Sequence, residues 1–100
     1  YMAVFDNLDI SILLGNIADD TKRYYLDKTI SNLSDKDLEL LETYFFHDMS
    51  LKGTCEELYL HKNTLQYKLD RIHKITGYNP RNFKNAVVLY IGLKLLKIEK

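Results

Sequence analysis

The side chains that could do chemistry in this 100-residue chain gather in the second half, mostly between residues 61 and 74. Amide side chains such as Asn63 and Gln66 can hydrogen-bond N6 and N7 of adenine, and a lysine such as Lys62 can donate to O6 and N7 of guanine. These three residues are therefore candidates for reading DNA bases. Other donors and cations suit phosphate oxygens, which position a protein on DNA without specifying sequence. The phosphate candidates are Lys52, Thr54, His61, Thr64, Tyr67, Lys68, Arg71 and Lys74.

Helical periodicity places most of these groups on one helix, over about 61–76. At 100° per residue, Leu65, Leu69 and Ile72 fall on one narrow stripe, which predicts the buried face. Asp70 points outward and would repel phosphate unless it pairs with Lys74 at i+4 or accepts from a cytosine amine. The other outward side chains are Asn63, Tyr67 and Lys74, with Gln66 and Arg71 on the flanks.

A shorter helix precedes this one and completes a helix-turn-helix arrangement. Ser50 can cap a helix over about 51–58, whose inward positions are Leu51, Cys55 and Leu58. Leu60 fills the turn, and we expect Cys55 to stand where the two helices pass closest. In this arrangement the second helix lies in the DNA major groove. The same periodicity also occurs in helical hairpins that have only a solvated charged face.

The remaining chain is also helical, which predicts an all-α bundle of about five to six helices. Ser34 and Asp37 form a capping-box pattern that begins a helix ending near His47. Asp19 or Asp20 can cap an earlier helix. Gly77 suits the end of the long helix. The first predicted helix runs over 10–16, with Ile10, Leu13, Leu14 and Ile17 spaced for one buried face, and the helix that Asp19 or Asp20 caps runs to about Ile30. The last predicted helix runs over 81–98, with Pro80 in the first turn. No segment alternates with the period of a strand.

Composition limits the function classes. The chain is 46% hydrophobic and 28% charged, which is typical of a folded soluble domain. Residues 1–50 carry a balance of −6 and residues 51–100 a balance of +6, so the second half can meet a polyanion, unless the split is chance scatter. No apolar run is long enough to span a membrane. A single cysteine fits a reducing cytoplasm.

The string from Thr54 to Ile72 resembles the C-terminal helix-turn-helix of PucR- and CdaR-type bacterial transcriptional regulators. That family shows T-A-x-x-L-x-x-H-R-N-T-L-x-Y-R-L-x-x-I followed by T-G. The chain departs from the pattern conservatively at Cys55, Lys62 and Lys68, and these lysines lack the bidentate fork of arginine. The positions that it keeps are Thr54, Leu58, His61, Asn63, Thr64, Leu65, Tyr67, Leu69, Ile72, Thr76 and Gly77.

The resemblance implies a Fis-like DNA-binding output domain of a metabolite-responsive regulator. Sugar diacids and purine breakdown products are effectors of named members. Residues 1–33 are then a helical linker or tail of a missing upstream sensor domain, within which residues 5–8 weakly resemble the stretch leaving such a domain, and 34–100 form the DNA-binding domain. The expected partners are double-stranded DNA and a second copy of the chain, with no cofactor and no membrane.

Several residues have alternative interpretations. His47, His61, His73 and Cys55 match no zinc spacing, and a cysteine between helices is usually inert, so neither a metal site nor catalysis is expected. His61 is either a structural cap or directed toward phosphate, and Tyr67 either donates to phosphate or packs over the shorter helix.

The last predicted helix is apolar on most sides. We therefore expect part of it to pack against a second copy or against the missing upstream domain. A protein-interaction bundle without DNA binding is the alternative function, but it gives no reason to concentrate lysine in one half of the chain.

Overall fold

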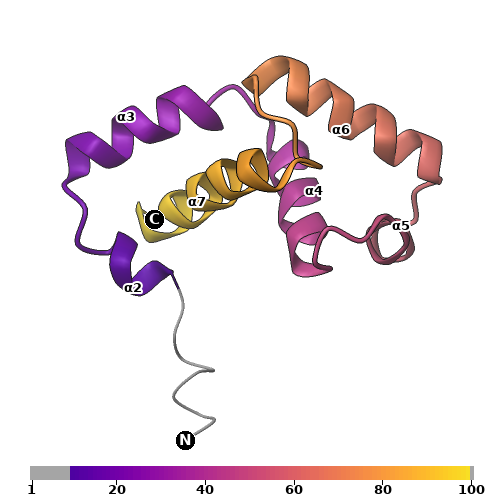
Figure 1. The fold of residues 1–100 in the computed structure, drawn as a ribbon, viewed down its shortest axis with the longest axis horizontal. Helices are drawn as coiled ribbons and strands as arrows, with labels where there is room; N and C mark the ends of the chain where they lie inside the picture. The colour runs from indigo at the N-terminus through magenta and orange to yellow at the C-terminus, as the bar shows by residue number, and fades with distance from the viewer. Residues whose placement is uncertain (1–9, 100) are drawn as a thin grey trace, which may run out of the picture.

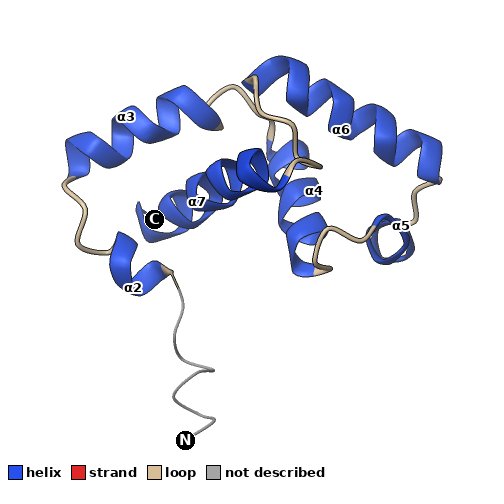
Figure 2. Ribbon diagram, in the orientation of Figure 1, coloured by secondary structure: helices blue, strands red, loops and turns tan. Residues whose placement is uncertain are grey.

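The structure is a computed structural model that describes residues 10–99. Within that range the chain is helical and contains no strand, which confirms the predicted all-α class (Figure 2). The similarity at residues 5–8 lies outside the described residues. The helices are α2 (Ser11–Leu14), α3 (Asp19–Thr29), α4 (Asp35–Phe46), α5 (Leu51–Leu58), α6 (Lys62–Thr76) and α7 (Phe83–Glu99).

Helix α7 lies at the centre of the fold, with α2 and α3 on one side and α4 to α6 on the other (Figure 1). The Tyr25 hydroxyl of α3 donates to the carbonyl of Val88 at 2.8 Å. A Cβ at Gly92 would stand 3.1 Å from Oγ1 of Thr29 and 3.3 Å from Cγ2 of Ile30. Glycine therefore permits the close approach of α7 to α3.

The predicted helix caps are present on the side of the fold that carries α4 to α6. Ser34 and Asp37 form a reciprocal capping box at the start of α4. The Ser50 hydroxyl accepts from the backbone N–H of Gly53 at 3.1 Å and begins α5. Gly77 ends α6 with a φ of 83°, a left-handed conformation that glycine adopts without strain.

Three local predictions were wrong. The N-cap of α3 is Ala18, and Asp19 and Asp20 lie in the first turn instead. Leu13, expected on the buried face of the first helix, is 73% exposed. Pro80 lies in the turn before α7 rather than in its first turn, because the side chain of Asn82 caps that helix by accepting from the backbone N–H of Asn85.

Helix α7 has the uncovered apolar part that the sequence predicts, but this part is small and lies at one end. Helices α2, α3 and α4 cover most of α7, and Leu89, Leu93 and Leu95 are at most 4% exposed. Its large exposed apolar side chains are Phe83 and Val87, at the N-terminal end. The division of the chain at residue 33 stays a prediction.

Candidate nucleic-acid interface

Helix α6 is fixed against the rest of the fold by one fully buried stripe. Leu65, Leu69 and Ile72 are each 0% exposed, as the periodicity predicts. Helix α5 ends at Tyr59, whose φ of 56° is left-handed, and the backbone N–H of Leu60 then donates to the carbonyl of Cys55. This sharp turn sets α6 across α5. The opposite face of α6 is consequently free to meet a ligand.

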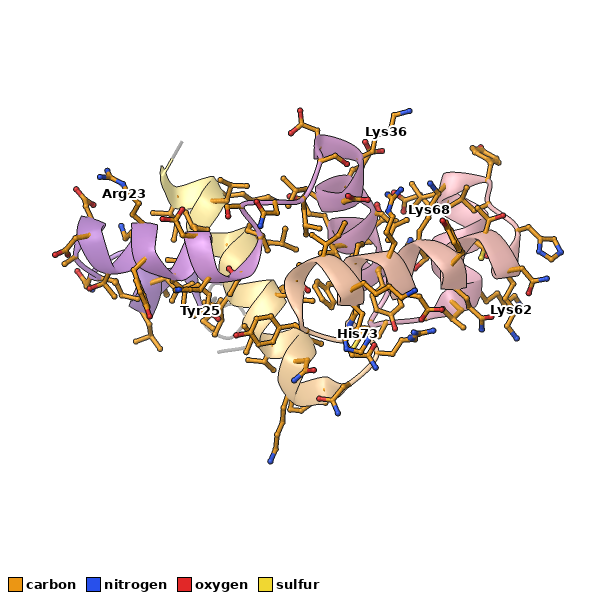
Figure 3. The ribbon with its side chains drawn as sticks, turned by 90° about the horizontal axis from the view of Figure 1, so that it is seen from above. Arg23, Tyr25, Lys36, Lys62, Lys68 and His73 are labelled. Atoms are coloured by element: carbon orange, nitrogen blue, oxygen red, sulfur yellow. The ribbon has the colours of Figure 1, made fainter. Side chains whose placement is uncertain are left out.

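The three base-reading candidates lie together at the start of α6. Lys62 and Asn63 occupy its first turn and are exposed, and Gln66 follows one turn later and is partly exposed. The first turns of a recognition helix are the part that reaches base edges. Figure 3, which looks at the fold from above, shows Lys62 at the N-terminal end of α6 and Lys68 further along the helix.

His61 caps α6, and the cap determines which ring nitrogen remains available. Its Nδ1 accepts from the backbone N–H of Asn63 at 3.1 Å. In the neutral ring the proton therefore resides on Nε2, which can donate to an acceptor outside the protein. The capping interpretation of His61 is confirmed, and its contact to phosphate stays a prediction.

Most of the phosphate candidates are accessible around this face. Tyr67 is 68% exposed, so the alternative that its ring packs over α5 is wrong. Lys52, at the start of α5, is exposed as well and lines the same surface hollow as Lys62, which puts a cation beside the N-terminal end of α6. The other accessible candidates on α6 are Thr64, Lys68 and Lys74, of which Lys68 is partly buried.

Thr54 does not belong to this surface, and its prediction as a phosphate contact was wrong. The residue is 0% exposed. Its hydroxyl donates to the carbonyl of Ser50 at 2.7 Å, which satisfies the buried group within α5. Thr54, rather than the partly exposed Cys55, is the fully buried side chain of α5.

Arg71 is also engaged inside the protein rather than free for phosphate. Its Nη2 donates to Oδ1 of Asp37 on α4 at 2.5 Å, and the Asp37 side chain is only 7% exposed. Burial raises the pKa of Asp37, but the hydrogen bonds from Arg71 and Ser34 outweigh burial and hold that pKa below its ordinary value of 3.8. Arg71 thus links α6 to the capped end of α4.

Asp70 finds a partner that the sequence spacing did not indicate. Its carboxylate accepts from Nη2 of Arg81, in the turn between α6 and α7, rather than from Lys74. The negative charge on the outer side of α6 is therefore neutralised within the protein.

The described residues contain no cluster of three or more histidine, cysteine or acidic side chains that could hold a metal ion. Nε2 of His47 pairs with Glu57 at 2.7 Å, which joins the end of α4 to α5. Among residues 10–99, no helix is long and apolar enough to cross a membrane.

A longer helix with one buried stripe, set across a shorter helix by a left-handed turn, defines a helix-turn-helix domain. Residues 37–95 match the family described as the PucR C-terminal helix-turn-helix domain, and the chain belongs to this family. The predicted resemblance is therefore confirmed.

Several of the relatives are transcriptional regulators. The chain is 29% identical to the carbohydrate diacid regulator of Escherichia coli, over 91% of this chain and 25% of that protein. It is 31% identical to the proline-responsive transcriptional activator PutR of Bacillus subtilis, over 73% of this chain and 20% of that protein. It thus spans a quarter or less of the length of these relatives.

A solved structure shares the fold. It is the regulator of polyketide synthase expression from Bifidobacterium adolescentis, with a TM-score of 0.73 and 26% identity. The match covers 89% of this chain and 38% of that one.

Proposed function

We propose that this chain is the DNA-binding output domain of a metabolite-responsive transcriptional regulator, with α6 in the major groove. The observation that carries the proposal is the division of α6 into a fully buried stripe and an outer face that begins with Lys62 and Asn63. A fixed helix with exposed amide and ammonium groups in its first turns suits direct reading of base edges. The names of the relatives, which include a purine catabolism regulatory protein, support a role that responds to metabolites.

The proposal distinguishes two kinds of contact with DNA. Lys62, Asn63 and Gln66 read bases, and the surrounding donors bind phosphates and fix the register of the helix in the groove. The domain acts in the cytoplasm, where its DNA lies, and has a regulatory rather than a catalytic role. The proposed phosphate contacts are Lys52, His61, Thr64, Tyr67, Lys68 and Lys74, which omits Thr54 and Arg71 because both are engaged internally.

Binding of labelled random duplex, measured by fluorescence anisotropy at 50 and 200 mM salt, tests this proposal. Each phosphate that a lysine neutralises releases counterions, so the lysines among the proposed phosphate contacts predict an affinity loss on the order of 10–10² between these salt concentrations. Lys68→Met should make the dependence on salt shallower, whereas Arg23→Met on α3 changes the same charge away from α6 and should not. A folded chain that shows no binding at low salt would favour the protein-interaction module instead.

We also propose that two copies of the chain pair through the exposed N-terminal end of α7. Phe83 is 73% exposed, and Phe46 of α4 is 78% exposed. A groove of about 350 Å³, which is lined by Phe45, Phe83 and Tyr90 among others, lies between these two helices. A two-fold dimer could place two recognition helices about 34 Å apart, one turn of duplex.

Sedimentation equilibrium at high micromolar concentration checks the pairing. The unmodified chain should show a dimer, and Phe83→Glu should shift it to monomer because a carboxylate would be buried without a partner. A monomer of the unmodified chain contradicts the proposal and would leave this end of α7 to the upstream domain.

A further inference from the structure

The ion pair between Asp70 and Arg81 lies at the edge of the proposed interface and is partly exposed. Asp70 is on the outer side of α6, seven residues after Asn63, and its side chain is 56% exposed. At 1.5 Å per residue this places it about 10 Å further along the helix axis, well beyond the first turns that reach base edges. Asp70 therefore stands near the point where α6 would leave the groove beside one phosphate backbone.

Arg81 comes from a turn whose own hydrogen bonds fix its backbone. Its N–H donates to Oδ1 of Asn79 at 3.1 Å, and the N–H of Asn79 donates to Oδ1 of Asn85 on α7 at 3.0 Å. Pro80 between them is buried. These hydrogen bonds hold the backbone of Arg81 in place, and Asp70 holds the guanidinium of Arg81 against the outer side of α6.

The two arginine pairs that contact α6 differ in burial. Asp37 is only 7% exposed, so releasing Arg71 to a phosphate would leave a buried carboxylate without its cation. Asp70 and Arg81 are 56% and 33% exposed, and a pair in contact with water contributes little by itself. Arg81 can consequently share its donors with a phosphate at low cost, whereas Arg71 cannot.

We propose that Arg81 is a DNA-backbone contact outside the helix-turn-helix motif, and that Asp70 presents it to a phosphate beside the C-terminal half of α6. A guanidinium has five N–H donors, and the Asp70 carboxylate occupies only part of them. The remaining donors can bind phosphate oxygens, for which the planar fork of arginine is well suited. The proposal rests on the proposed function, because it requires that α6 bind duplex DNA.

A double-mutant cycle distinguishes a direct contact between Arg81 and phosphate from a role in which Arg81 only neutralises the charge of Asp70. Asp70→Asn removes the charge and keeps an amide oxygen that can still accept from Arg81. If Arg81 contacts phosphate, Arg81→Met makes the slope of log affinity against log salt shallower by about 0.9, with either Asp or Asn at position 70. If Arg81 serves only to neutralise Asp70, Arg81→Met weakens DNA binding in the chain that keeps Asp70 and has no effect in the chain that carries Asp70→Asn. That result overturns the proposal.

Two further variants control the cycle. Arg81→Lys keeps the charge and should keep the slope, so a fall in slope for this variant contradicts the proposal. Arg23→Met removes the same charge from α3, at the opposite end of the molecule from Lys62 (Figure 3), and should leave the slope unchanged. Circular dichroism confirms that each variant is folded. Failure of the unmodified chain to bind any duplex would instead refute the proposed function itself.

Discussion

Asp37→Asn is expected to lower the free energy of unfolding by about 2 kcal/mol at neutral pH. The carboxylate of Asp37 has two partners, the backbone N–H of Ser34 at the start of α4 and the guanidinium of Arg71 on α6. An amide keeps the shape but loses the charge that holds Arg71, whose buried Nε already has no hydrogen-bond partner among the described residues. The loss is below that of a fully buried pair, because the Arg71 side chain is 43% exposed.

Thermal unfolding from pH 7 to pH 2 measures the effect and its origin. About 2 kcal/mol corresponds to a fall in Tm of about 8–16 °C for a domain of this size. Because the folded-state pKa of Asp37 lies below 3.8, its contribution is complete well above pH 4 and is lost as the pH falls through 3.8 and below. The difference between Asp37→Asn and the unmodified chain should therefore disappear in acid.

Asp35→Asn is the matched control, since Asp35 lies in the same first turn of α4 and is exposed. Both carboxylates interact favourably with the helix dipole, but only Asp37 bonds to another helix. We expect Asp35→Asn to cost less than about 1 kcal/mol. Equal losses for the two variants would show that the dipole, rather than the link to Arg71, accounts for the effect.

The sequence was sufficient where a structure depends on neighbouring residues. The capping box of Ser34 and Asp37, the start of α5 at Ser50 and the end of α6 at Gly77 all follow from short spacings and backbone preferences. The buried stripe of α6 follows equally from its period. The outer face of α6 was therefore predictable as well, because it is the complement of the buried one.

Contacts between distant segments were not predictable in the same way. Asp37 and Arg71 are 34 residues apart, and no local pattern indicates that they meet. Spacing at i+4 favoured Lys74 as the partner of Asp70, but the turn after α6 brings Arg81 to it. Both arginine pairs depend on how the helices pack against one another, and local patterns in the sequence do not reveal that packing.

The misassignment in α5 and the extent of cover on α7 have different physical causes. Thr54 and Cys55 both fit the spacing between Leu51 and Leu58, and threonine can be buried because its hydroxyl bonds to the carbonyl four residues earlier. For α7, the sequence indicated an apolar helix but not its neighbours. Residues assigned to a linker supply α2 and α3, which cover that helix.

Asn63→Ala is expected to relax discrimination at one base pair by about 1–3 kcal/mol, a factor of roughly 5 to 150 in relative affinity. Asn63 lies in the first turn of α6 with an exposed side chain, and a bidentate amide contact distinguishes adenine from the other bases. Alanine is a strong helix former, and the backbone N–H of residue 63 still donates to the ring of His61. The substitution should therefore leave the position of α6 unchanged.

Selection of preferred duplexes from a random pool, followed by competition among single-base variants of the selected site, measures this loss. Lys68→Met is the contrasting variant, because removing a phosphate contact should weaken all duplexes about equally. The two variants together test whether base reading and phosphate binding belong to different residues of α6. Asn63→Ala should change the preferred sequence, and Lys68→Met should change only the affinity and its dependence on salt. If Asn63→Ala weakened all duplexes equally and kept the same preference, Asn63 would be a backbone contact, and base reading would rest on Lys62 and Gln66.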